Sequence, residues 1–213
     1  MNELSNSLEQ TLKSDLTNLA FETTEKCLNS CLVDSTILML PIASLIKTVQ
    51  SIPNILVSRK IIRFIACLKN TSLEERVMFL ERVNSKKRTI GDFYINILNV
   101  LQKLEQEEKA DIVAFIFKMM LYEKITIEVG NRLILIIANL QLSDLVALSE
   151  LTEEKILKNQ LLLDTLLGSG VLSTLYEMIP SDEPRLAIYK FNAVGENLIS
   201  VMREYHADEE EKV

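Results

Sequence analysis

The chain has 213 residues and a formal net charge of −7, and 48% of its residues are apolar and 25% charged. This composition is typical of a globular protein, excludes an intrinsically disordered chain, and predicts one sizeable hydrophobic core. The chain contains 5 glycines and 4 prolines, whereas average usage would give roughly 15 and 10. Few tight turns are therefore available, and we predict a mainly α-helical protein, a multi-helix bundle with a small C-terminal β-hairpin.

Apolar residues recur at helical spacing along most of the chain. In the first 30 residues, leucines at spacings of three and four form the apolar stripe of an amphipathic helix. Ser72 and Glu75 form a capping box, which predicts a helix over about 73–84. We expect the apolar face of this helix to hold Leu73, Val77 and Leu80.

Later elements follow from the same periodicity and from capping residues. A helix is expected to start near Gly91, and a buried helical hairpin to follow it. The C-terminal part should contain two short strands and a closing helix. The expected hairpin consists of a helix over 108–122 and a second helix that begins at Thr126, with the apolar face Val129, Leu133, Ile136, Ile137 and Leu140. After the hairpin we expect helices over 144–150 and 153–167, two strands within 171–191, and a last helix over 193–206.

Residues 35–58 contain one charge, Lys47, and two prolines, Pro41 and Pro53. A helix built from this stretch would be apolar on every side, so protein or lipid must surround it. A membrane-spanning helix needs about 20 predominantly apolar residues, whereas the longest uncharged run here, residues 35–46, has 12. We predict a buried hairpin of a soluble protein, with peripheral membrane contact as the alternative.

The stretch from Arg59 to Arg88 is strongly basic. It holds nine basic and three acidic residues, a net charge of +6, which leaves −13 for the rest of the chain. Such a stretch can bind an anionic membrane surface or a nucleic-acid backbone, and a solvated helix face is the alternative. Its place behind an apolar segment favours the membrane surface over nucleic acid. The candidate surface residues are Arg59, Lys60, Arg63, Lys86, Lys87 and Arg88.

The last part of the chain is similar to the second half of a winged-helix module, with a helix, a glycine turn, a hairpin and a closing helix. This pattern predicts a helical core domain over 1–150, a winged-helix-like segment over 151–206 packed on the core, and an acidic tail over 207–213. A DNA-reading helix needs basic or amide side chains. This helix offers Lys155, Lys158, Asn159 and Gln160 against Glu153, Glu154 and Asp164, so we do not expect nucleic acid as a partner.

Signals for catalysis are nearly absent. The chain has one histidine, His206, beside the acidic tail, and neither a Gly-rich phosphate loop nor HExxH. Cys27 and Cys31 would share a helix face, but with Cys67 as the only other thiol we interpret them as packed apolar side chains. We predict a non-enzymatic protein without metal or cofactor.

The cysteine content also bears on location. An odd number of thiols without disulfide spacing is typical of a reducing compartment, and the first residues, MNELSNSLEQTLKSDL, show no apolar leader. We predict a cytoplasmic protein, with a peripheral position at the inner face of the membrane as the alternative.

Several apolar segments carry a resemblance to known proteins. They are LPIASLIKTV, SRKIIRFIACL, SLEERVMFLERV, KADIVAFIFKMMLYEKIT, SDLVAL and YKFNAVGENL. Over residues 38–202 the chain resembles a loosely defined group of uncharacterised bacterial all-helical proteins, some of them prophage-borne. The resemblance implies a role in bacterial conflict, such as phage defence or immunity, and brings no catalytic residue with it.

Three functional hypotheses follow from the sequence. The first is a non-enzymatic module that binds another protein. The second is a membrane-associated effector that uses residues 35–63, and the third is a winged-helix transcriptional regulator. The sequence identifies neither the partner nor the oligomeric state, so a homo-oligomer stays open.

Overall fold

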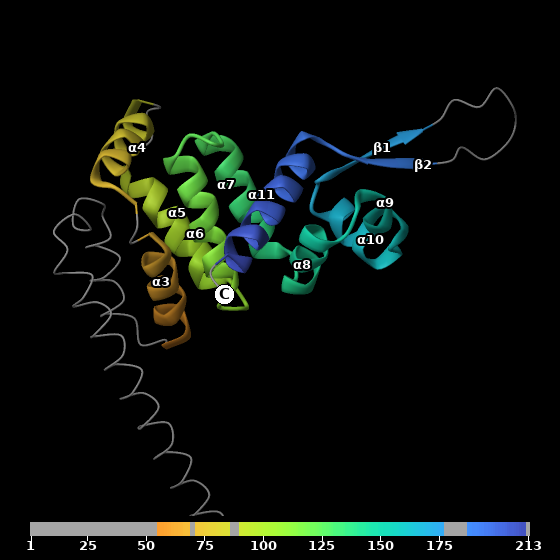
Figure 1. Ribbon diagram of the computed structural model, residues 1–213, viewed down its shortest axis with the longest axis horizontal. Coiled ribbons are helices and arrows are strands. Elements are labelled where there is room, and N and C mark those ends of the chain that lie inside the picture. Colours follow the sequence, from red (N-terminus) through yellow and green to blue (C-terminus); the bar gives the residue numbers. More distant parts are fainter. Residues whose placement is uncertain (1–54, 69–70, 86–89, 177–186, 212–213) are drawn as a thin grey trace, which may run out of the picture. The chain divides into compact units, whose positions relative to one another are not determined.

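The computed structural model describes residues 55–68, 71–85, 90–176 and 187–211 (Figure 1). This part of the chain is mainly helical, with one two-stranded antiparallel hairpin near the C-terminus, as predicted. The helices are α3 (Ile55–Leu68), α4 (Leu73–Ser85), α5 (Ile90–Lys103), α6 (Lys109–Leu121), α7 (Ile127–Asn139), α8 (Leu142–Glu150), α9 (Glu153–Lys158), α10 (Gln160–Gly168) and α11 (Ala193–Glu210), and the strands are β1 (Leu172–Tyr176) and β2 (Ala187–Phe191).

Contacts divide the chain into two compact units, 1–114 and 115–213, with the division inside α6. The boundary predicted at residue 150 falls inside the second unit, between α8 and α9.

In the first unit, α5 contacts both α3 and α4. The apolar face of α3 points into this core, since Ile61 and Phe64 are fully buried. The capping box at the start of α4 is confirmed: the Ser72 backbone N–H donates to Glu75 Oε2 at 2.8 Å, and the Glu75 N–H donates to Ser72 Oγ at 3.2 Å.

The predicted apolar face of α4 is correct only in part, since Leu80 is half-buried but Val77 is exposed. Val77 is 37% exposed, whereas Phe79 and Val83 are buried. Arg76, on the same helix, is 1% exposed and donates to the carbonyl oxygens of Leu68 and Thr71. The Leu68 carbonyl is the last one of α3 and the Thr71 carbonyl lies in the connection after it, so α4 turns Arg76 inward to satisfy both. The buried face of α4 is therefore shifted away from Val77.

In the second unit, α6 and α7 form the predicted helical hairpin, and Leu133, Ile136, Ile137 and Leu140 on the expected face are buried. The Met120 side chain of α6 lies against Gly130 of α7. A Cβ there would collide with the Met120 side chain. The turn between the helices places Glu123 at a positive φ of 59°, a conformation that favours glycine.

The single helix predicted over 153–167 is instead two helices, α9 and α10. The break falls at Asn159, whose backbone is extended (φ −86°, ψ 101°). Its side chain accepts a hydrogen bond from the Leu162 N–H at 3.2 Å and so caps α10. Asparagine favours this capping role over a helix interior because its side chain competes for backbone groups.

The hairpin begins where α10 ends. Gly170 adopts φ +74°, and β1 then pairs with β2 from Leu172↔Phe191 to Tyr176↔Ala187. Figure 1 shows the hairpin extending away from α9, α10 and α11. β2 leads directly into α11, which packs against α7 and α8.

Asn192 joins the hairpin to α11. Its side-chain Oδ1 accepts from the N–H groups of Val194 and Gly195, which caps the helix. Its Nδ2 donates to the Gly170 carbonyl at 2.9 Å, and its backbone N–H donates to the Val171 carbonyl at 3.1 Å. Gly195 permits this approach, because a Cβ there would collide with the Val171 carbonyl oxygen.

The last helix extends further than predicted. α11 continues to Glu210, so residues 207–210 of the predicted acidic tail are helical. Contacts within the second unit hold these turns: the ring of Tyr205 meets Phe115 edge-on at 5.5 Å, and Glu204 pairs with Lys124.

We expect Asn192→Ala to lower the free energy of unfolding by about 2 kcal/mol, because it removes a helix cap and a hydrogen bond to Gly170. Asn192→Asp keeps an acceptor for the two N–H groups and loses only the amide donor, so its loss should be about half as large. Urea unfolding followed by circular dichroism measures both. Equal losses in the two variants would mean that the cap contributes nothing.

Candidate functional site

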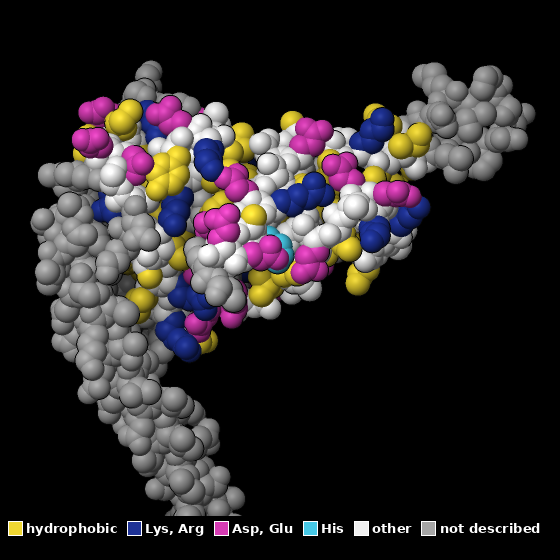
Figure 2. All heavy atoms as spheres, in the orientation of Figure 1, with side chains coloured by type: hydrophobic (Ala, Val, Ile, Leu, Met, Phe, Trp, Pro, Cys, Tyr) yellow, Lys and Arg dark blue, Asp and Glu magenta, His cyan; other side chains and the backbone are white. Residues whose placement is uncertain are grey.

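The two described cations on the outer side of α3 are paired with carboxylates in the first unit. Arg59 Nη1 lies 3.4 Å from Glu107 Oε1, and Arg63 forms an ion pair with Asp111. Lys86, Lys87 and Arg88 lie outside the described residues. Figure 2 shows side chains of both signs interspersed on the visible surface. The charge that Arg59 and Arg63 would offer to an anionic surface is therefore largely balanced.

Lys60 does not belong to a surface. It is 6% exposed, and its Nζ donates a hydrogen bond to the carbonyl oxygen of Leu104, the residue after α5. The last carbonyls of a helix carry partial negative charge and lack intrahelical partners. Lys60 thus stabilises the end of α5, and the prediction of Lys60 as an interaction residue is corrected.

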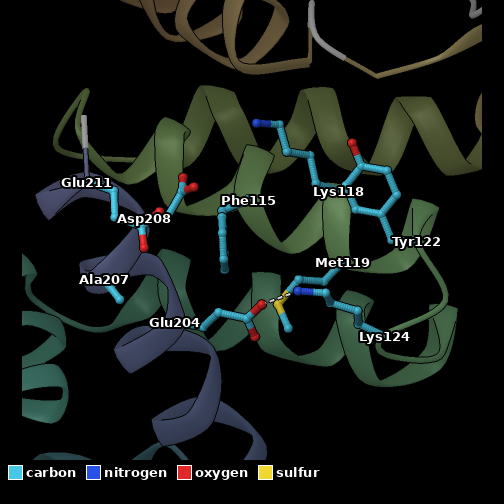
Figure 3. A pocket seen from close by; sticks show the side chains of 9 residues that line it. All are labelled: Phe115, Lys118, Met119, Tyr122, Lys124, Glu204, Ala207, Asp208 and Glu211. Carbon is cyan, nitrogen blue, oxygen red and sulfur yellow. Dashed lines mark hydrogen bonds and ion pairs between the residues drawn. The ribbon is translucent and has the colours of Figure 1, made fainter.

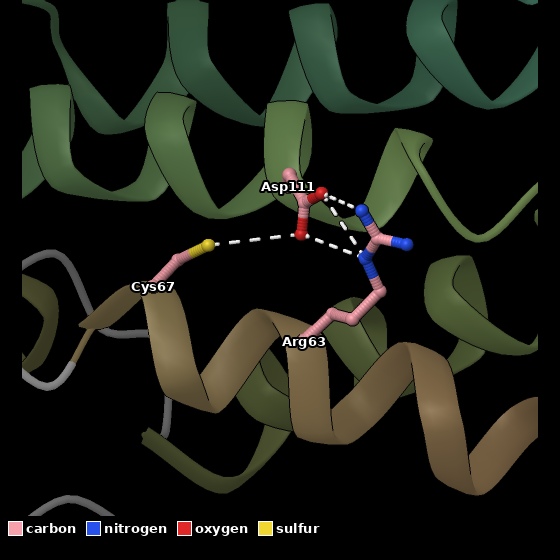
Figure 4. Close-up of polar contacts among 3 residues, drawn as sticks. All are labelled: Arg63, Cys67 and Asp111. Atoms are coloured by element: carbon pink, nitrogen blue, oxygen red, sulfur yellow. Dashed lines mark hydrogen bonds and ion pairs between the residues drawn. The ribbon is translucent and has the colours of Figure 1, made fainter. Parts of the chain in front are cut away.

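Arg63, Asp111 and Cys67 form a small polar cluster (Figure 4). Arg63 Nε lies 3.1 Å from each Asp111 carboxylate oxygen, and the Cys67 Sγ lies 3.7 Å from Oδ1. The hydrogen bonds that Arg63 donates to Asp111 raise the pKa of Arg63 above its ordinary value, so the guanidinium stays charged. With both its oxygens accepting from Arg63, Asp111 is placed as an ion-pair partner and not as a general base for the thiol.

A pocket of about 400 Å³ lies in the second unit between α6, the turn after it, and α11 (Figure 3). Phe115, Met119 and Tyr122 contribute its apolar part. Lys118 and Lys124 face Glu204, Asp208 and Glu211 across it, and Lys124 pairs with Glu204. The polar part of the lining consists of lysines, carboxylates and the Tyr122 hydroxyl.

A second hollow, a groove of about 420 Å³, lies between α7 and α10. Its apolar residues, Leu135, Ile136 and Leu140, come from α7 and its C-cap, and Thr165, Gly168 and Ser169 come from the end of α10. Ile136 and Leu140 are buried, whereas Leu135 is 56% exposed. A Cβ on Gly168 would meet no atom within 4 Å, so the groove is open there.

The sequence shows the apolar surplus of one wall of this groove, although not the groove itself. Residues 133–137, LILII, are five consecutive apolar residues, which cover more than one face of a helix. Four of them are at most 7% exposed, and Leu135 is the one that remains at the surface. The same occurs in the run LLL at the start of α10, where Leu161, one turn before Thr165, is 79% exposed.

His206 and the cysteines supply no catalytic or metal-binding arrangement within the described residues. His206 is close to half exposed, and its Nε2 lies 3.3 Å from Glu210 on the same helix. No group of three or more His, Cys, Asp or Glu side chains in the described ranges is placed to hold a metal ion. Cys27 and Cys31 lie outside those ranges.

Among the described helices, none is both long and apolar enough to cross a membrane by itself. α7 and α8 together have the length and composition, but they are bent by 120° at the break between them. Residues 35–54 lie outside the described residues, so the prediction of a buried hairpin there stays a prediction.

Comparisons with known proteins found no similar protein. No protein-family model, no curated protein and no solved structure matches this chain.

The two adjacent cations of α3 should respond differently to charge reversal. Lys60→Glu places a carboxylate beside the Leu104 carbonyl in a buried position and should lower the free energy of unfolding by about 3 kcal/mol or more. Arg59→Glu reverses an exposed charge, and we expect a change below about 1 kcal/mol. Chemical denaturation measures both. A Lys60→Glu protein as stable as Arg59→Glu would show that Lys60 reaches solvent.

Proposed function

We propose that this protein is a non-enzymatic module that binds another protein through the groove between α7 and α10. The observation that carries the proposal is Leu135, a large apolar side chain that is 56% exposed at the edge of an open groove. Covering such a side chain with a partner stabilises the complex by on the order of 1 kcal/mol, and neighbouring apolar surface adds to this.

The composition of the groove supports a protein partner. The groove combines the apolar residues Leu135, Ile136 and Leu140 with the polar residues Arg132, Asn139 and Thr165. Protein–protein interfaces usually combine apolar and polar residues in this way. An apolar side chain on a helix of the partner would enter beside Gly168, where α10 has no side chain.

The winged-helix regulator receives less support. α10, the helix before the hairpin, has the sequence QLLLDTLLG, which holds no Lys or Arg and one Asp. Lys158 of α9 pairs with Glu154 on the same helix. A phosphate backbone needs clustered, uncompensated cations, and these two helices do not provide them.

The setting of this function rests on the sequence. The absence of catalytic motifs supports a binding role without chemistry, the thiol content supports a cytoplasmic location, and the resemblance to prophage-borne helical proteins supports a role in bacterial conflict. The membrane-associated alternative rests on residues 35–63, of which 35–54 lie outside the described residues.

The groove offers variants that change binding without disturbing the fold. Gly168→Leu should fill the groove, and it should keep or raise stability, because leucine is a better helix former than glycine by up to about 1 kcal/mol. Leu135→Ser removes the exposed apolar side chain. The matched control is Val146→Ser on α8. Val146 is 41% exposed and does not line the groove.

The test is affinity purification of each tagged variant from its native host, with quantitative mass spectrometry of the proteins that remain bound. We expect one protein that is retained by the wild type and by Val146→Ser and lost from both Gly168→Leu and Leu135→Ser at unchanged melting temperature. Equal retention by all four proteins would overturn the groove as the binding site.

A further inference from the structure

The hydrogen-bond register of the hairpin identifies which backbone groups of β1 point outward. The Asn192 N–H donates to the Val171 carbonyl, and these two residues continue the register of Leu172↔Phe191. In an antiparallel pair, hydrogen-bonded and non-hydrogen-bonded positions alternate. Ser173 and Leu175 therefore direct their backbone groups to β2, and the N–H and C=O of Thr174 point away from it.

This outer edge of β1 is accessible and lacks the usual protection. Ser173, Thr174 and Leu175 are all exposed, and within the described residues β1 pairs with β2 alone. β1 contains no charged residue and no proline. Natural edge strands usually carry lysine, proline or a bulge to prevent pairing with another chain. The edge of β1 is therefore suited to accept a further strand.

We propose that β1 pairs antiparallel with β1 of a second copy of this chain, about a two-fold axis at Thr174. The result is a four-stranded sheet with the order β2–β1–β1–β2. Because a two-stranded hairpin is marginal by itself, a sheet of four strands gives it the pairing that it lacks. This inference uses other residues than the groove and does not rest on the proposed function.

The strand is self-complementary in this register. The axis places Thr174 opposite Thr174 of the second copy and Ser173 opposite Leu175, so no like charges meet. Leu175 and Ile188 are cross-strand neighbours, 48% and 38% exposed. In this register Leu175 lies opposite Ser173 of the second copy, so the Leu175–Ile188 pair and its symmetry mate are diagonal neighbours on one face of the four-stranded sheet.

The opposite edge is less suited to this pairing. β2 carries Lys190, whereas β1 holds no charged residue. By the same alternation, the N–H of Tyr189 points outward from β2. A proline at Tyr189 or at Thr174 thus removes an outward N–H and leaves the bonds between β1 and β2 intact. The two positions form a matched pair of edge-blocking variants.

Sedimentation velocity of the full chain as a function of concentration tests the proposal. We expect a dimer for the wild type and for Tyr189→Pro. For Thr174→Pro the dissociation constant should rise by roughly 30-fold or more, because the two-fold axis removes two hydrogen bonds at once. A wild type that stays monomeric to the limit of its solubility, or a dimer equally stable in Thr174→Pro, would overturn the proposal.

A charge pair tests the register and guards against misfolding of the proline variant. Thr174→Lys and Thr174→Glu should each be monomeric where the wild type is a dimer, because residue 174 meets itself at the axis. An equimolar mixture of the two should restore a dimer that salt weakens. No recovery in the mixture, with circular dichroism unchanged, would contradict pairing at Thr174.

Discussion

Asn192 makes the contact on which the second unit depends. Four hydrogen bonds of this residue join the end of α10 at Gly170, the base of the hairpin at Val171, and the first turn of α11. The absence of a Cβ at Gly195 permits the approach. The bond to Val171 sets the register that turns the Thr174 backbone outward. α11 also packs on α7, which forms one wall of the groove, and the end of α10 forms the other. The Asn192 junction therefore links the two walls.

In the first unit, basic residues serve the fold. Lys60 satisfies the carbonyl after α5, Arg76 satisfies those after α3, and Arg63 is fixed by Asp111. Residues 59–88 carry a net charge of +6. The sequence alone does not show which of these cations pair with residues far away in the chain. The partners of Arg59 and Arg63 lie 48 residues further on, at the start of α6 or just before it.

Features with local causes were predictable from the sequence. The Ser72 capping box, the buried face of α7 and the hairpin before a closing helix depend on residues close together in the chain. The break at Asn159 also has a local cause, but the periodic leucines on both sides of it obscured the capping signal. The inward position of Arg76, the exposure of Leu135 and the length of α11 depend on tertiary contacts, which periodicity does not contain. The groove belongs to this second class, since its walls come from helices separated by α8 and α9.

The central claim is that the Asn192 junction is as stable as the helices it joins and so holds both proposed surfaces in place. Native-state hydrogen exchange of the amides of Asn192, Val194 and Gly195 tests it most directly, because first-turn amides of a helix exchange quickly unless they are capped. The account predicts that these three amides exchange as slowly as those at the centre of α7, with the same dependence on denaturant. Rapid exchange at Val194 and Gly195 while α7 stays protected would contradict it.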